Sequence, residues 1–288
     1  MIWGSPVFIM ISGYLLIGSS ATGNFYQFIK KRLNKIIIPL IFWNIIYYIY
    51  NNFDHLSLTD FLYQLLHAGT HSHLYFLNVM VGLYFITPYL SSIIPKIKLS
   101  IVVPILIILS SIYHYSYCFL GFPRLDNILV IFIPYIGYYL AGYWIGHLTY
   151  FKYQKIFSIF SIIFFVVSIL ITRKLFFIFE TNDQDTILVS RLSLPVAAIA
   201  ISLFYYLINI TNRTLSRLRF LTPVSQLTFG IYLIHPLILG ILRSSQFFSA
   251  LMSQSYWIWL FLLFISTSTL SILLTYIINK LPILRRVI

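Results

Sequence analysis

Long apolar stretches recur along this chain and constrain its fold more than any other feature. A window of about 20 apolar residues, or somewhat fewer, forms a helix that crosses a hydrocarbon core about 30 Å thick. Only 9% of the 288 residues are charged, whereas soluble domains carry about 25%. The apolar windows lie at 5–20, 36–50, 74–92, 99–118, 128–147, 156–172, 187–209, 224–243 and 256–278. They predict an all-α, polytopic membrane bundle of about nine transmembrane helices, in a single domain that covers residues 1–288.

The distribution of charge between the loops predicts the orientation of these helices. Cytoplasmic loops of membrane proteins are enriched in Lys and Arg. If the loop 21–35 is cytoplasmic, then 93–98, 148–155, 210–223 and the tail from 279 are cytoplasmic too. These five segments hold most of the 19 basic residues, and all 6 acidic residues fall on the other face. We therefore expect the amino terminus outside and the carboxyl terminus in the cytoplasm. The net charge of +13 is explained by this topology and not by nucleic acid binding.

Cysteine and histidine are too sparsely placed to predict a metal site. The single Cys118 excludes a disulfide framework and a multi-cysteine metal site. His67, His71 and His73 lie close together, but their spacing defines no coordination geometry and no carboxylate lies between them. We predict no bound metal.

Four stretches in order carry a resemblance that covers essentially the whole chain. They are PVFIMISGYLL at 6–16, KKRLNKIIIPLIFW at 30–43, HLYFLNVMVGLYFITPYL at 73–90 and FGIYLIHPLIL at 229–239. In this order and at these spacings, the chain resembles the acyltransferase type 3 family of polytopic membrane acyltransferases. The most similar branch comprises O-acetyltransferases that act on surface polysaccharides.

This resemblance implies an activity and one departure from the family pattern. It implies an acyltransferase of the multi-pass cell membrane, which transfers an acyl group, acetyl in the first instance, from an acyl-CoA such as acetyl-CoA. The acceptor is a hydroxyl of a cell-envelope polysaccharide, an exopolysaccharide or a lipid-linked glycan, and membrane lipid surrounds the protein. Family members begin with a helix that carries a basic residue and the histidine taken as the catalytic base. No stretch of this sequence matches that helix, so we expect a chain that lacks it.

The basic residues at the start of the second apolar window are the candidates for donor binding. Lys31, Arg32 and Lys35 could bind the anionic acyl-CoA, and Arg32 and Lys35 share a face if the helix begins early. An Arg offers a planar fork to phosphate, whereas a Lys offers a point charge. The family usually shows Arg at both positions of that pair, so Lys35 is a departure. Anchoring of the helix by positive charge is the alternative explanation.

His235 and His73 are the candidate catalytic residues. A hydroxyl attacks a thioester poorly unless a base removes its proton, and histidine suits this task. His235 lies in the middle of an apolar window and precedes Pro236, which frees a backbone carbonyl one turn earlier. A neutral histidine hydrogen-bonded between helices is the alternative for His235, and an interfacial histidine is the alternative for His73.

Ser12 and Gly13 are candidates for lining a tunnel for the acyl chain of the donor. Small residues leave space for such a chain, but they also allow helices to pack closely. Two other functions remain open for the whole chain. One is a transporter or exporter of a glycan or lipid-linked sugar, which a mid-membrane histidine and a proline-broken helix also fit. The other is an inactive, truncated copy of the acyltransferase.

Overall fold

The computed structural model describes residues 4–19, 25–67, 69–148, 153–179, 190–209, 222–282 and 284–288, with the side chains of 172–179 and 224 excepted. Some charges used to predict the orientation lie outside the described residues or side chains. They are Lys152, Arg173, Lys174, Glu180, Asp183, Asp185, Arg213, Arg217 and Arg219. The predicted orientation of the termini therefore stays a prediction.

The chain divides into two compact units, which we describe separately. Unit 1 comprises Met1–Leu33, Leu66–Ala68 and Tyr75–Ile210, and unit 2 comprises Asn34–Leu65, Gly69–Leu74 and Thr211–Ile288. Both are built from helices, and the described residues contain no strand beyond an isolated bridge between His67 and Asn127. The all-α prediction is confirmed. A single domain over the whole chain stays a prediction.

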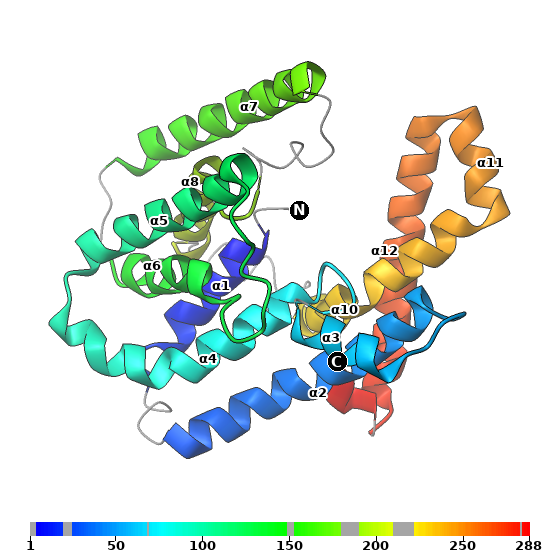
Figure 1. Cartoon of the computed structure of the whole chain (residues 1–288), viewed down its shortest axis with the longest axis horizontal. Helices are drawn as coiled ribbons and strands as arrows, with labels where there is room; N and C mark the ends of the chain where they lie inside the picture. Colours follow the sequence, from blue (N-terminus) through cyan, green and yellow to red (C-terminus); the bar gives the residue numbers. More distant parts are fainter. Residues whose placement is uncertain are drawn as a thin grey trace. The chain divides into compact units, whose positions relative to one another are not determined.

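Unit 1 packs short central helices between longer ones (Figure 1). Its helices are α1 (Gly4–Leu16), α4 (Tyr75–Ile93), α5 (Leu99–Leu120), α6 (Ile136–Gly146), α7 (Gln154–Phe179) and α8 (Leu194–Ile208), with short 3-10 turns at Ile94–Lys96 and Ile133–Tyr135.

Unit 2 is organised around the long helices α10 and α12, which pack against each other (Figure 1). Its helices are α2 (Phe25–Asn51), of which the residues from Asn34 onward belong to this unit, α3 (Leu58–Leu66), α10 (Thr222–Ser244), α11 (Gln246–Gln254) and α12 (Tyr256–Lys280), followed by a 3-10 turn at Leu284–Val287.

Among the residues that the structure describes, six helices are long and apolar enough to cross a membrane, which supports a multi-pass membrane protein. Each of the nine predicted windows contains a helix, but three of these helices are shorter than predicted: α1, α6 and α8. Proline explains two of the late starts, because it favours the first turn of a helix over its interior. Pro134 lies in the 3-10 turn before α6, and Pro195 lies in the first turn of α8. Nine crossings therefore stay a prediction.

Close contact of backbones holds α1 against α6 in unit 1. A Cβ atom added to Gly13 would lie 1.9 Å from the carbonyl oxygen of Tyr139, and one added to Gly142 would lie 1.9 Å from that of Met10. Apolar side chains gain little from leaving lipid, so membrane helices associate through such close packing. Gly13 therefore serves helix packing, and the tunnel predicted beside it stays a prediction.

We expect Gly13→Ala to lower the free energy of unfolding by about 1–3 kcal/mol, because the added methyl group forces the backbones of α1 and α6 apart. The midpoint of thermal unfolding in detergent measures this effect. Leu15→Ala, which shortens an exposed side chain on the same helix, is the control and should change the midpoint little. Equal midpoints for the two variants would contradict the close packing of α1 on α6.

Candidate active site

Pro236 removes one backbone hydrogen bond from the middle of α10, and the side chain of His235 donates a hydrogen bond to the carbonyl that is left without a partner. Proline has no N–H, so the carbonyl of Tyr232, four residues earlier, loses its helical partner. His235 Nδ1 lies 2.8 Å from this oxygen and 3.1 Å from the carbonyl oxygen of Ile231. Both partners can only accept, so Nδ1 carries the proton. The neutral ring then presents Nε2 as an acceptor.

The hydroxyl of Tyr47 bridges the next position of the same helix. It donates to the carbonyl of Leu233 at 2.7 Å and accepts from the amide of Leu237 at 3.2 Å, the two groups that a regular helix joins to each other. Tyr47 comes from α2 and is fully buried. The interrupted segment of α10 is therefore fixed to α2 by one buried hydroxyl.

His71 and His73 lie on the turn before α4, and α2 holds this turn in place. The amide of Thr70 donates to the side-chain oxygen of Asn44 at 2.9 Å, and the Thr70 hydroxyl lies 3.1 Å from the backbone oxygen of Asn44. Asn51 donates to the carbonyl of Thr70 at 3.1 Å. Asn44 is fully buried, so these polar contacts are shielded from solvent and give the turn a defined position.

The two predicted catalytic histidines come together with a third histidine and two tyrosines, all within unit 2. The ring centroids of His73 and His235 are 6.1 Å apart, and those of His71 and His73 are 4.8 Å apart. Tyr47 lies 4.7 Å from His71 and 4.8 Å from His73, and Tyr232 lies 5.5 Å from His73. The Tyr232 hydroxyl also donates to the backbone oxygen of His73. We call these five residues the histidine cluster.

The hydrogen bonding within the histidine cluster restricts its protonation. The Nδ1 atoms of His71 and His73 are 2.8 Å apart, so one ring donates and the other accepts. Burial, and then the neighbouring His71 and His235, lower the pKa of His73 to about 3, and burial also lowers that of His71. His73 is therefore neutral near pH 7. Its Nε2 is buried near the backbone of Leu233 and makes no hydrogen bond of regular geometry with the described residues.

The histidine cluster carries ring nitrogens that can take up or release a proton. The prediction that the chain binds no metal stays a prediction. The described part of the chain contains no group of His, Cys, Asp and Glu arranged to hold a metal ion. For proton transfer the cluster offers the Nε2 acceptor of His235, whereas Nε2 of His73 is enclosed by the protein.

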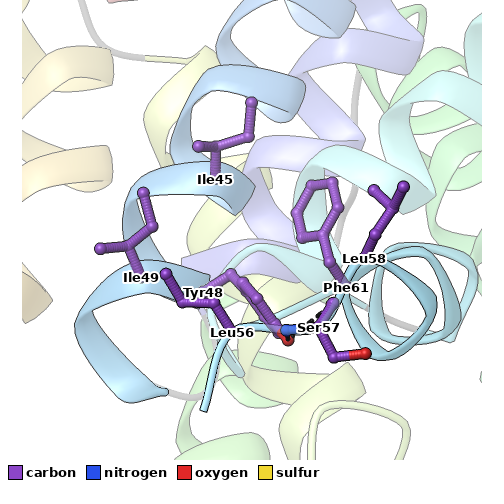
Figure 2. A pocket seen from close by; sticks show the side chains of 7 residues that line it. All are labelled: Ile45, Tyr48, Ile49, Leu56, Ser57, Leu58 and Phe61. Atoms are coloured by element: carbon purple, nitrogen blue, oxygen red, sulfur yellow. Dashed lines mark hydrogen bonds between the residues drawn. The ribbon is translucent and has the colours of Figure 1, made fainter. Parts of the chain in front are cut away.

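A separate hollow of about 240 Å³ opens between the end of α2 and α3 (Figure 2). The Tyr48 hydroxyl at its edge donates to the carbonyl of Ser57 at 2.8 Å and accepts from the Ser57 amide at 3.0 Å. Its lining comprises Ile45, Tyr48, Ile49, Leu56, Ser57, Leu58 and Phe61. This hollow suits a hydrocarbon group, and its lining holds no histidine or carboxylate for acid-base chemistry.

In unit 1, one tyrosine connects a residue predicted to bind the donor with one predicted to line the tunnel. The side chains of Ser12 and Tyr84 share a hydrogen bond, and the charge of Arg32 acts on the same tyrosine hydroxyl. The charge of Arg32 also acts on Tyr139, whose hydroxyl lies 2.7 Å from that of Thr87. Arg32 therefore lies near enough to these two hydroxyls for its charge to act on them, and anchoring at the membrane surface stays an alternative explanation for it.

The helix that carries the predicted donor-binding residues begins earlier than the apolar window suggested. Because α2 starts at Phe25, Lys31, Arg32 and Lys35 all lie on regular helix. The condition under which Arg32 and Lys35 share a face is met. Their role in donor binding stays a prediction.

Comparison with known families decides the identity of the chain. A family model described as an acyltransferase domain matches residues 1–276 of the 288 residues. The chain belongs to this acyltransferase family. The match confirms the resemblance carried by the four sequence motifs, and with the apolar helices it indicates a membrane acyltransferase. No curated protein and no solved structure matches the chain.

The sequence predicted two members of the histidine cluster and missed three. Tyr47 and Tyr232 were indistinguishable from the other 21 tyrosines, and His71 was considered as a metal ligand and set aside. His71 lies in a loop, but that loop folds back onto α2. For Tyr232 a signal was available in the sequence. It lies four residues before Pro236, so its backbone carbonyl is the one that loses its helical hydrogen bond.

We expect His73 to make the protein less stable in mild acid. The unfolded chain takes up a proton below about pH 6.5, whereas the buried ring stays neutral down to about pH 3, so stability is complete above pH 6.5 and falls as the pH is lowered between these values. Between pH 7 and pH 5 we expect a loss of about 1–2 kcal/mol. Thermal unfolding of the protein in detergent at the two pH values measures the loss.

The variant His73→Gln should reduce this pH dependence. The control His55→Gln removes an exposed histidine of the same unit and should retain the dependence of the unaltered protein. If His73→Gln retains it as well, His73 is not a buried neutral group.

Proposed function

We propose that this membrane acyltransferase is an O-acyltransferase, which transfers an acetyl group from acetyl-CoA to a hydroxyl of a cell-envelope polysaccharide or exopolysaccharide. The family match over residues 1–276 supports acyl transfer. The observation that supports transfer to a hydroxyl oxygen is the geometry of the His235 ring. Its Nδ1 donates to two backbone carbonyls, so its Nε2 is left to accept a proton. A sugar hydroxyl needs such a base to attack a thioester.

In the proposed reaction, His235 Nε2 takes the proton of the acceptor hydroxyl as its oxygen attacks the thioester carbonyl. A bond forms between this oxygen and the acyl carbon, the bond between carbon and sulfur breaks, and the proton passes to the departing thiolate of CoA. His73 is proposed to stabilise the negative charge on the carbonyl oxygen once substrate binding uncovers its buried Nε2, provided that this atom carries the hydrogen. That tautomer requires His71 to donate between the two Nδ1 atoms, which their separation of 2.8 Å allows.

The donor is proposed to bind at the amino-terminal part of α2. Lys31, Arg32 and Lys35 supply positive charge for the phosphates of acetyl-CoA, and the Arg32 guanidinium can bind one phosphate in a bidentate manner. Ser12 and Gly13 are proposed to line the path of the acyl chain. The hydrogen bond between the side chains of Ser12 and Tyr84, on which the charge of Arg32 acts, supports a role of Ser12 near the proposed donor site.

The setting that we propose for the reaction is the cell membrane, with the acceptor supplied as a polysaccharide or a lipid-linked glycan. The six apolar helices support a multi-pass location. No metal and no nucleic acid enter the proposed mechanism. Transport of a glycan is the second candidate function, because α10 carries a histidine and a proline in the middle of an apolar helix.

Replacing His235 should abolish transfer while the protein stays folded. The assay follows transfer of radiolabelled acetyl from acetyl-CoA to purified cell-envelope polysaccharide in membranes that contain the full chain. We expect His235→Gln to lower the rate by about 100-fold or more, the range that a general base contributes. The matched control is His147→Gln, because His147 Nδ1 also bonds to a carbonyl of its own helix, that of Tyr143, at 2.7 Å.

The same membranes separate the alternative functions. Glycan that crosses vesicles without acetyl-CoA would support the transporter. Folded protein without transfer or transport would support an inactive copy. A full rate in His235→Gln would show that His235 is not the base.

Removing the charges of α2 should weaken donor binding more than it slows the chemistry. For the pair Arg32→Gln and Lys35→Gln, we expect the KM for acetyl-CoA to rise about tenfold or more, since hydrogen bonds to charged groups contribute about 1.5–3 kcal/mol each. The kcat and the KM for the polysaccharide should change much less. The control is Lys280→Gln at the end of α12. An unchanged KM for acetyl-CoA in the double variant would show that the donor binds elsewhere.

A further inference from the structure

A hollow of about 380 Å³ opens in unit 2 where α10 ends and α11 and α12 follow. These three helices lie side by side (Figure 1). The lining comprises Arg243, Phe248, Ser249, Met252, Ser253 and Trp259. Its volume falls in the range of about 300–1,000 Å³ that is typical of pockets for small molecules.

The hollow contains one full positive charge that no described group neutralises. Arg243 lies in the last turn of α10, and no carboxylate of the described residues forms a salt bridge with it. None of the six lining residues is acidic. The ligand that complements this charge is an anion, and a guanidinium matches the planar edge of a phosphate.

The other walls of the hollow are apolar and firmly placed. Phe248 and Trp259 are buried and form a core with Leu263, while Met252 is half exposed at the rim. Ser249 and Ser253 bond to carbonyls of their own helix at 3.1 and 2.7 Å. Hydroxyl groups can turn to donate to another acceptor. The hollow thus combines a cation and two hydroxyls with a surface for hydrocarbon.

The depth of the hollow in a membrane indicates the source of such a ligand. Arg243 lies one residue before the end of the apolar helix Ser225–Ser244, and the next apolar helix begins at Tyr256. Trp257 is largely exposed beside the start of this helix, and Trp is enriched at the level of lipid headgroups. Both features favour a position of the hollow near the depth of the phospholipid phosphates.

We propose that this hollow binds an anionic phospholipid of the surrounding bilayer. The phosphate lies on Arg243 and within reach of Ser249 and Ser253, and the first part of an acyl chain lies against Phe248, Met252 and Trp259. The site is independent of the histidine cluster and of the proposed acyl transfer. It tethers the short helix α11 to the membrane surface.

Quenching of Trp259 by brominated lipids tests this proposal at the site itself. The full chain is measured in neutral detergent in a Trp257→Phe background, and the signal of Trp259 is obtained by subtraction of the Trp257→Phe, Trp259→Phe double variant. The probes are dibrominated phosphatidylglycerol and dibrominated phosphatidylcholine. We expect about fivefold tighter binding of phosphatidylglycerol, the factor that corresponds to about 1 kcal/mol for one basic residue at a membrane surface.

Variants at one position separate a charge effect from a loss of folding. The preference for phosphatidylglycerol should disappear in Arg243→Gln and persist in Arg243→Lys, while quenching by phosphatidylcholine persists in both. The control is Arg124→Gln, since Arg124 lies over the ring of Tyr117 in unit 1, at 4.6 Å from its centroid. This variant should bind as the unaltered protein does.

Two results would overturn the proposal. One is an equal preference for phosphatidylglycerol before and after Arg243→Gln. The other is complete competition by soluble glycerol phosphate at the concentration of the lipid, because the hollow would then bind a free anion without the hydrocarbon chain.

Discussion

Inside a membrane, every backbone N–H and C=O must find its partner within the protein, because lipid offers none. Under this constraint, the proline in α10 requires a replacement hydrogen bond from elsewhere in the protein. Pro236 leaves the carbonyl of Tyr232 without a helical donor, and the chain satisfies that carbonyl with the ring of His235. The Tyr47 hydroxyl bridges the adjacent pair, Leu233 and Leu237. The repair of one interrupted helix thus fixes the orientation of a histidine ring and binds α10 to α2.

Hydrogen bonds also determine which ring nitrogens of the histidine cluster are occupied. His71 and His73 face each other through their Nδ1 atoms, and the Asn44 side chain holds the turn on which they lie. The donors and acceptors of these rings are largely used in fixing their positions. The ring nitrogen that these bonds leave as an acceptor is Nε2 of His235, while Nε2 of His73 is buried. Rigid placement of this kind favours acid-base chemistry, since a base contributes most when it is oriented in advance.

Several parts of this description were accessible from the sequence. Apolar windows identify the helices, and the four ordered motifs identify the family, which the match over residues 1–276 confirms. The sequence also selected His235, since a histidine before a proline in mid-membrane stands out chemically. It failed where helices are shorter than their apolar windows: α6 and α8 begin late, because apolar character measures affinity for lipid and does not register where a turn replaces a helix. It also failed for Tyr47, because nothing local distinguishes this tyrosine from its many neighbours.

The sequence by itself determined that the chain is helical, that it resides in a membrane and that it belongs to an acyltransferase family, because composition, periodicity and ordered motifs are properties of the linear chain. Only the tertiary structure decided that His71 joins His73 and His235, that Tyr47 bridges α10, and that Arg243 faces an apolar hollow. These contacts join residues up to 190 positions apart, and whether such groups meet depends on how whole helices pack. That packing is governed by close approach at glycines such as Gly13 and by buried hydrogen bonds, and neither leaves a periodic signal in the sequence.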